Sequence, residues 1–285
     1  MRKYVDGHTH LWPKESLTQE MRERGETVGY SIPDINVSEV VREMDEADID
    51  FVVVIAYPMR KLWNAREDFP LRVIDACKEY PDRFSIVGGI EVNELTTEEV
   101  KKWLEVQYSS GVTGFKLHPP HMWVKPNDYR EEERGLKGLE LLYQFAEDHD
   151  LPVIIHTGTS FFLTARNKYA DPVFVDDVAV DFPKLRVIMA HMGRPSWTSA
   201  AFQLVRIRRN VYGDLSSIPP KRLTEYLPRV DEIADKLIYG SDAGGPGVKG
   251  LKAHLTEFLN SGVSLRTKEV MTRDNPRKFF RVIER

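Results

Sequence analysis

The sequence predicts a single-domain α/β protein, a (β/α)₈ TIM barrel that spans residues 1–285. Short apolar runs rich in β-branched residues alternate with longer charged segments of helical period, which is typical of a parallel sheet covered by helices. Eight such runs occur, and they begin at Lys3, Phe51, Phe84, Gly111, Pro152, Arg186, Val211 and Leu237. Eight strands with a helical segment after each favour a closed barrel, because an open doubly wound sheet normally has fewer strands.

The segments between the runs carry apolar residues at helical spacing, most clearly from Ser38, from Thr96 and from Glu132. We expect Ser38 and Thr96 to be helix N-caps. Two connections are longer than the minimal unit, from Leu11 to Ser38 and from Pro119 to Glu131. Both follow strands, so in a barrel they lie at the C-terminal mouth, and we expect them to shape a substrate pocket.

Composition limits the classes of partner. The chain has 40 basic and 44 acidic residues and a formal charge of −4, so it has no global electrostatic attraction for nucleic acid or an anionic membrane. Cys77, the only cysteine, excludes an intramolecular disulfide and a cysteine-rich zinc site, and we expect it to be structural. The chain has no room for a signal segment before DGHTH and no run long enough to cross a bilayer. We therefore expect a cytoplasmic protein with a small-molecule partner; a homo-oligomer is compatible with these features.

Histidine and aspartate recur where the predicted strands end. His8 and His10 end the first run, and their period-two spacing places both imidazoles on the same side of the strand. His156, His191 and Asp242 end the fifth, sixth and eighth runs. Several imidazoles with one carboxylate are a donor set suited to Zn²⁺, with Fe, Mn, Co or Ni as alternatives. The sequence therefore predicts a divalent metal site at the barrel mouth. His149 and His254 fall within predicted helices beside charged residues, and we expect both to be solvated.

Five motifs resemble the amidohydrolase superfamily: DGHTH, the HTG after the fifth run, AHMG, YGSDA and the closing DNPRKFF. The resemblance runs from Asp6 to Phe280. AHMG, GSDA and the late Asn-Pro look like the amidohydrolase-related branch, also called amidohydrolase 2, which includes relatives of aminocarboxymuconate-semialdehyde decarboxylase. That branch contains both hydrolases and non-oxidative decarboxylases, so the resemblance implies the scaffold more firmly than the reaction.

The same resemblance implies roles for single residues. His8, His10, His156 and Asp242 resemble the ligands of one-metal members, and His191 resembles the unliganded histidine that serves as a base. A base of this kind suits metal-activated water, whose pKa lies near about 7.

Lys116, in GFKLHP at the end of the fourth run, leaves the metal count open. In two-metal members a carboxylated lysine at this place bridges the ions, and Lys116 and His191 would then join the four ligands. The alternative is an uncarboxylated lysine that pairs with Asp242 or with a substrate carboxylate. We expect one zinc ion per chain, with two ions as the alternative.

Five residues are candidates for substrate binding. Lys116 and His118 share one side of their strand, and the nearby His121 is a further candidate. Arg194 follows His191 by three residues, and its planar guanidinium matches a carboxylate through two hydrogen bonds. Trp12 follows the first run and would wall the pocket. The alternatives are a rim hydrogen bond for His118, a helix-surface ion pair for Arg194 and plain packing for Trp12.

The sequence thus predicts a metal-dependent hydrolase that acts on a small carboxylated ester, lactone or amide, with His191 or Asp242 handling the proton. The alternative in another reaction class is a metal-dependent non-oxidative decarboxylase of an aromatic or dicarboxylic acid. A more remote alternative is a metal-binding barrel without catalytic activity.

Overall fold

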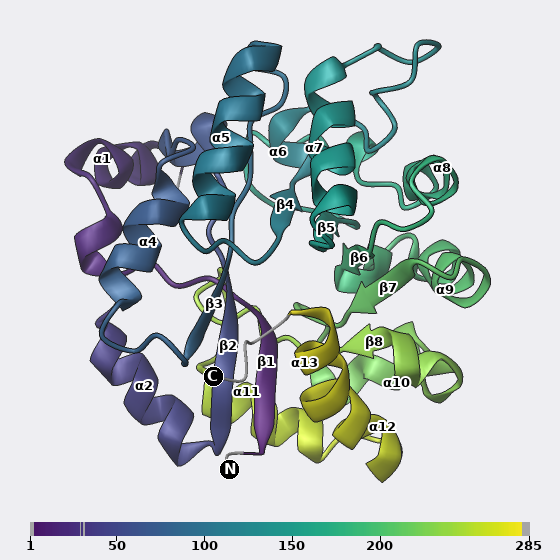
Figure 1. Ribbon diagram of the computed structural model, residues 1–285. Helices are drawn as coiled ribbons and strands as arrows, with labels where there is room; N and C mark the ends of the chain where they lie inside the picture. The colour runs from purple at the N-terminus through teal and green to yellow at the C-terminus, as the bar shows by residue number, and fades with distance from the viewer. Residues whose placement is uncertain (1–2, 29, 31, 281–285) are drawn as a thin grey trace.

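The computed structural model describes residues 3–28, 30 and 32–280, and Figure 1 shows strands in the middle of the molecule with helices around them. Every predicted apolar run contains a strand. The strands are β1 (Tyr4–Thr9), β2 (Ile49–Ile55), β3 (Phe84–Val87), β4 (Phe115–Leu117), β5 (Val153–His156), β6 (Val187–Ala190), β7 (Val211–Asp214) and β8 (Leu237–Ile238).

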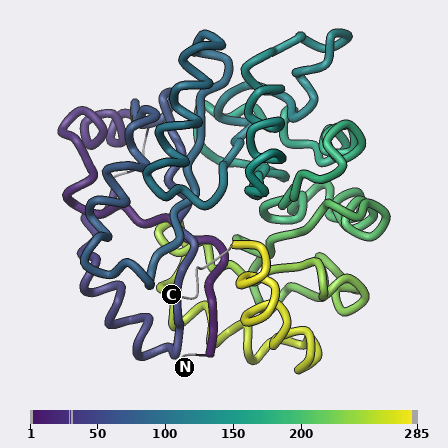
Figure 2. Tube along the Cα trace, in the orientation of Figure 1, coloured from purple at the N-terminus to yellow at the C-terminus, as the bar shows by residue number. Residues whose placement is uncertain are grey.

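All strand pairs are parallel and follow chain order, in one group β1-β2-β3 and another β4-β5-β6-β7-β8. A parallel bridge between Gly88 and Phe115 joins β3 to β4, and a second one between Thr9 and Ala243 joins the end of β8 to β1. The trace in Figure 2 runs once around the barrel, so that the last helix, α13 (Asn275–Phe279), returns beside β1. The predicted TIM barrel is confirmed.

The α-helices are α1 (Gln19–Thr27), α2 (Val37–Glu46), α3 (Arg60–Trp63), α4 (Phe69–Cys77), α5 (Thr97–Ser109), α6 (Pro119–Met122), α7 (Lys137–Asp148), α8 (Phe174–Asp181), α9 (Thr198–Ile207), α10 (Leu223–Tyr226), α11 (Leu251–Leu259), α12 (Leu265–Glu269) and α13 (Asn275–Phe279). Short 3₁₀ turns are η1 (Lys14–Ser16), η2 (Asn167–Tyr169), η3 (His191–Gly193), η4 (Pro220–Arg222) and η5 (Val230–Lys236), and a π turn, η6 (Val270–Asp274), precedes α13. No helix in the described part of the chain is long and apolar enough to cross a membrane.

One of the two predicted N-caps is correct. Thr96 forms a capping box: its hydroxyl accepts from the Glu99 amide at 3.3 Å, and the Glu99 carboxylate accepts from the Thr96 amide at 2.9 Å. Ser38 is not a cap, because Asn36 lies two residues earlier and accepts from the Ser38 amide at 3.0 Å. Two good capping residues compete here, and the first one begins the helix.

The long connections fold as part of the mouth. The connection from Leu11 to Ser38 contains η1 and α1, and the connection from Pro119 to Glu131 opens with α6. The helix expected from Glu132 begins only at Lys137, because Gly135 has a φ of 58°, which a right-handed helix does not use.

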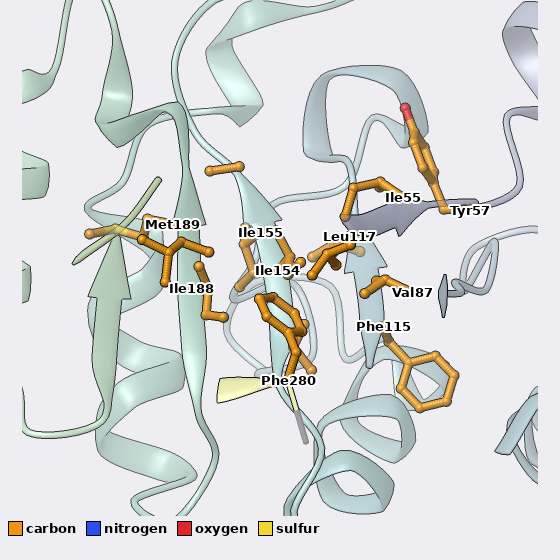
Figure 3. Packing of buried hydrophobic residues seen from close by; sticks show 14 of the residues in the cluster. Ile55, Tyr57, Val87, Phe115, Leu117, Ile154, Ile155, Ile188, Met189 and Phe280 are labelled. Carbon is orange, nitrogen blue, oxygen red and sulfur yellow. The ribbon is translucent and has the colours of Figure 1, made fainter. Parts of the chain in front are cut away.

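The strands are buried on both faces. Figure 3 shows the close packing of strand side chains such as Ile55, Leu117 and Ile155, all of which are 0% exposed. Helices cover the outside of the barrel, which explains why the strands read as continuous apolar runs. Each such side chain contributes about 1.5–3 kcal/mol on burial, so the strands form a rigid base whose C-terminal ends hold the polar residues.

The burial of three side chains outside the site, Cys77, His254 and His149, depends on how their helices pack on the barrel. Cys77 in α4 is buried, and burial raises the pKa of its thiol to about 12, as a structural role requires. The expectation that His254 is solvated is wrong: it is 8% exposed, and its Nδ1 lies 3.0 Å from the Tyr239 hydroxyl, because this face of α11 packs toward β8. His149 is only half-buried, with its ring stacked on Phe145.

Candidate active site

The polar residues at the strand ends collect around one open cavity of about 620 Å³. All of the site residues that the sequence predicts line it, except His8, which is fully buried. The mouth of the barrel is therefore the candidate functional site, in the place where this fold normally carries one.

His8, His10 and Asp242 form the centre of the site, with one potential ligand atom from each lying within 4.8 Å of the other two. His10 Nε2 lies 3.3 Å from Asp242 Oδ1, and His8 Nε2 lies 3.6 Å from the same oxygen. Both imidazoles therefore lie on the side of β1 that faces Asp242, the arrangement that their period-two spacing predicts. The Asp242 amide donates to the His8 carbonyl at 2.8 Å, so the pairing between the ends of β8 and β1 positions the carboxylate.

Hydrogen bonds fix the orientation of both imidazoles. His8 Nδ1 bonds the carboxylate of Asp214, and both side chains are fully buried. His10 Nδ1 lies 3.2 Å from the Ile55 carbonyl oxygen. Because these partners accept hydrogen bonds, each Nδ1 carries the hydrogen and each Nε2 directs a lone pair toward the space beside Asp242 Oδ1. The sequence reasoning missed Asp214, although its place at the end of the seventh run was a usable signal.

The charges of the central residues follow from burial and contact. Burial lowers the pKa of His8 and keeps the imidazole neutral, with the neighbouring Lys116 acting in the same direction. Burial alone would raise the pKa of Asp242, but the adjacent ring of His10 and the neighbouring His191 and His8 hold it well below its usual range. Neutral imidazoles and an ionised carboxylate are the states that bind a metal ion.

His156 lies outside this three-residue group but lines the same cavity. Its Nε2 is buried and has no hydrogen-bond partner in the described structure, and the same holds for His8 Nε2 and Asp242 Oδ1. A buried polar atom without a partner costs about 1–3 kcal/mol. Lone pairs left unpaired beside one cavity fit a bound cation, and this nitrogen-rich donor set with one carboxylate suits a zinc-type ion.

His191 follows β6 in η3, with a φ of 66°. Its Nδ1 lies 2.9 Å from the Ser216 carbonyl oxygen, which can only accept, so Nδ1 carries the hydrogen and Nε2 is free to accept a proton. Burial lowers its pKa well below the usual range, and Arg194 and His8 oppose its positive charge. Asp242 also has a left-handed φ, of 64°, and such strained backbone is concentrated at functional sites.

Lys116 is 1% exposed, and its Nζ has no hydrogen-bond partner among the described residues. The alternative pairing with Asp242 is therefore not formed. Burial lowers the pKa of Lys116 to about 8, against the opposing effects of Asp214 and Asp242. His118 Nδ1 is also buried without a partner, so the predicted alternative of a rim hydrogen bond is not formed either.

Arg194 is placed beside the loop that follows β5. Its Nη1 donates to the Thr159 carbonyl at 3.4 Å, and its Nε has no partner within the described ranges. The ion pair considered as an alternative is not formed there, which leaves the guanidinium without a carboxylate. Trp12 both walls the cavity and packs against other side chains. It lines the cavity, stacks on His10 and packs edge-on against Trp63.

The loops after β2 and β5 contribute residues that the sequence reasoning missed. Trp63 and Phe162 form an aromatic wall with ring centroids 6.2 Å apart. Tyr57 and Ser160 line the cavity beside His121. The signals for this wall were Trp63 after the second run and the Phe161-Phe162 pair after the fifth run.

Fold and site together define a TIM-barrel protein whose mouth is lined by histidines and an aspartate of the kind that holds a divalent metal ion. The chain belongs to the amidohydrolase family: the family model described as Amidohydrolase matches residues 5–282. Members of the amidohydrolase superfamily are generally metal-dependent enzymes, and this membership supports an enzyme here.

Solved structures support the fold. An uncharacterized TIM-barrel protein from Bordetella bronchiseptica is 21% identical, with a TM-score of 0.75 over 99% of this chain and 100% of the other. A 2,6-dihydroxybenzoate decarboxylase from Rhizobium is 16% identical, with a TM-score of 0.62 and 99% of each chain covered. An amidohydrolase from Burkholderia multivorans with bound HEPES is 11% identical, with a TM-score of 0.67 over 98% of this chain and 99% of the other. Comparison with curated proteins gives no match. At these identities the structures show the shared fold and leave the reaction to the site itself.

Proposed function

We propose that this protein is a metal-dependent hydrolase that acts on a small ester, lactone or amide bearing a carboxylate. The observation that carries the proposal is the set of buried polar atoms without hydrogen-bond partners on His8, His156 and Asp242, in and beside one cavity. His8, His10, His156 and Asp242 would hold one divalent ion, with zinc favoured by the donor set. When bound, such an ion activates water and polarises a substrate carbonyl.

His191 is the proposed base. Its neutral Nε2 faces the cavity, so it can accept a proton as water adds to the carbonyl carbon and return that proton to the departing oxygen or nitrogen. Asp242 is the second candidate, but its Oδ2 already accepts a hydrogen bond from Ser217. His191 is therefore better prepared for proton transfer, and the Asp242 carboxylate favours its protonated form against the effect of burial.

The cations of the cavity support an anionic substrate. Lys116 and Arg194 both line the cavity and are paired with no carboxylate in the part of the chain described here. A buried positive charge without a counter-charge is costly, and a substrate carboxylate would relieve that cost. The guanidinium of Arg194 is the better anchor because its planar geometry allows two parallel hydrogen bonds.

A second candidate reaction is decarboxylation of an aromatic acid. The aromatic wall of Trp63 and Phe162, extended by Trp12 against Trp63, favours a flat apolar group, and the Rhizobium enzyme of similar fold is described as a decarboxylase. Product analysis separates the two reactions. The metal-loaded protein would be incubated in ¹⁸O-water with carboxylated esters, lactones and amides and with aromatic acids. A hydrolase would place ¹⁸O in the carboxyl group of the acid product. Release of CO₂ together with an organic product that contains no ¹⁸O would reject hydrolysis in favour of decarboxylation.

Substrate charge has its own test, the Arg194→Ala variant. A charge-assisted contact contributes about 1.5–3 kcal/mol, so kcat/KM for the acid should fall by about 10–150-fold, and that for a neutral analogue by no more than about 3-fold. Arg222→Ala is the matched control, because Arg222 pairs with Glu225 at the exposed surface. Equal losses on acid and neutral substrates would show that Arg194 has a structural role only.

A further inference from the structure

Three cavity residues from separate loops form a continuous hydrogen-bonded chain. Tyr57 follows β2, His121 lies in α6 after β4, and Ser160 follows β5. The Tyr57 hydroxyl lies 3.1 Å from His121 Nδ1, and His121 Nε2 lies 3.0 Å from Ser160 Oγ. All three side chains line the cavity, and none is more than 9% exposed.

The protonation state of His121 requires the two hydrogen bonds between Tyr57, His121 and Ser160 to run in one direction. Burial and the nearby Lys116 lower the pKa of His121 to about 3, so the ring is neutral and has one donor and one acceptor nitrogen. The two hydrogen bonds must therefore run in the same sense. Either Tyr57 donates to His121 and His121 donates to Ser160, or both bonds are reversed.

Burial of Tyr57 favours the first sense. If the bonds were reversed, the hydrogen of the Tyr57 hydroxyl would be left without an acceptor among the described residues, although this side chain is only 2% exposed. An unsatisfied buried donor costs about 1–3 kcal/mol. In the favoured sense, Ser160 receives a hydrogen bond from His121 and keeps its own hydroxyl hydrogen for a ligand in the cavity.

The place of Ser160 indicates which part of a substrate it contacts. The rings of His156, His118 and His121 stack in that order, with centroid distances of 3.9 and 3.5 Å, so His121 is separated from the proposed metal ligand His156 by another ring. Arg194 Nη1 donates to the carbonyl of Thr159, the residue before Ser160. Ser160 therefore lies on the side of the proposed carboxylate anchor and away from the reacting carbonyl.

We propose that Tyr57, His121 and Ser160 form a specificity-determining relay that directs the Ser160 hydroxyl, beside Arg194, onto an oxygen acceptor at the end of the substrate remote from the reacting carbonyl. This inference rests on the proposed function and adds to it. The substrate class becomes monoesters, lactones or monoamides whose remote end carries a carboxylate oxygen, so that hydrolysis leaves a second carboxylate on the product.

The same geometry resembles a nucleophilic serine with its base, and the charges argue against that role. A nucleophilic serine needs a base whose protonated form is stabilised by a third group. Burial raises the pKa of Tyr57 well above its usual range, so its hydroxyl stays neutral and offers no negative charge. Lys116 further opposes a positive charge on His121. The relay is therefore suited to donating a hydrogen bond and not to accepting a proton.

Binding calorimetry on the metal-loaded protein tests the relay. The probes are succinate, glutarate and adipate as product analogues, their monoamides, and butyrate, which has no remote acceptor. Ser160→Ala should weaken the tightest dicarboxylate and its monoamide by about 5–30-fold and leave butyrate within about 2-fold, because only the remote hydrogen bond is lost. Ser160→Thr should restore binding to within about 3-fold, and Thr164→Val, which removes a hydroxyl of the same loop outside the relay, should change nothing.

Coupling between the ends of the relay separates positioning from simple packing. Tyr57→Phe should weaken dicarboxylate binding by about 3–10-fold when Ser160 is present and cause no further loss in the Ser160→Ala background. Independent, multiplying effects would overturn the relay. So would unchanged dicarboxylate binding by a folded Ser160→Ala protein, a preference for butyrate over every dicarboxylate in the unmodified protein, or covalent labelling of Ser160 by a sulfonyl fluoride.

The same probes distinguish failure of the relay from failure of the proposed function. Arg194→Ala should weaken the dicarboxylate far more than its monoamide, because only the former carries the remote charge. Loss of this charge preference together with an intact Ser160 effect would reject the carboxylate-specific anchor and keep the relay. An intact charge preference with no effect of Ser160→Ala would reject the relay and keep the carboxylate-specific anchor.

Discussion

Asp214→Asn should weaken metal binding although Asp214 is not a proposed ligand. Asp214 Oδ2 accepts the hydrogen bond from His8 Nδ1, while Oδ1 accepts from the Ser216 amide at 2.7 Å. Asparagine has only one acceptor oxygen, so it can satisfy one of these two donors. If its NH₂ group faces His8, the imidazole must shift to the tautomer with hydrogen on Nε2, and the lone pair needed by a metal ion is lost.

The size of the effect follows from the burial of the pair. His8 and Asp214 are both 0% exposed, so water cannot replace the lost hydrogen bond. Removing a partner that orients a metal-binding histidine typically costs about 10–100-fold in metal affinity, or about 1.4–2.8 kcal/mol. We therefore expect the dissociation constant for zinc to rise by about 10–100-fold, measured by competition with a chromogenic chelator at constant pH and ionic strength.

Asp6→Asn is the matched control. Asp6 is also fully buried, but its Oδ1 accepts both backbone hydrogen bonds, from His8 at 3.2 Å and from Ser241 at 2.9 Å, and asparagine can keep both. Burial raises the pKa of Asp6 to about 7, so much of its charge is already absent near neutral pH. The zinc affinity of the Asp6→Asn variant should stay within about 3-fold of that of the unmodified protein. Unchanged affinity in Asp214→Asn, or an equal loss in Asp6→Asn, would refute the orienting role.

Two further predictions separate chemistry and stability from metal binding. His191→Asn should lower kcat by at least about 100-fold while elemental analysis shows unchanged metal content, because the side chain moves a proton and is not a ligand in the one-metal site; loss of metal would show that it is one. Burial raises the pKa of Glu91 to about 7, opposed mainly by Lys61. Because the folded state holds this proton more tightly than the unfolded state, the stabilisation is complete below about pH 4.5 and is lost as the pH rises through about 7. Glu91→Gln should remove this dependence. In urea unfolding, the free energy of unfolding of the variant minus that of the unmodified protein should be larger at pH 8 than at pH 5, by up to about 3 kcal/mol. Parallel pH profiles of the two proteins would contradict the assignment.

The sequence predicted the barrel well because its strands are buried on both faces and therefore appear as separate apolar runs. It predicted the centre of the site for a related reason: a barrel brings the carboxyl ends of all strands together, so His8, His10 and Asp242 had to meet. The residue at which a helix begins was harder to predict where two capping residues lie close together. Asn36 and Ser38 are both good capping residues, and the choice between them depends on the preceding chain.

Residues that act through a neighbour could not be identified from spacing. Asp214 was visible at a strand end, but its contact with the His8 ring depends on the direction in which each side chain points into the barrel. The relay joins loops after β2, β4 and β5, whose paths have no periodic signature. Ser160 in particular stands in a short polar segment that nothing in the sequence relates to His121.

Anomalous diffraction at the metal absorption edge, combined with elemental analysis of protein purified without chelator, tests the central claim most directly. We predict one divalent ion per chain, surrounded by His8, His10, His156 and Asp242, with Lys116 unmodified. Two ions bridged by a carboxylated Lys116, or a single ion that His156 does not contact, would contradict it.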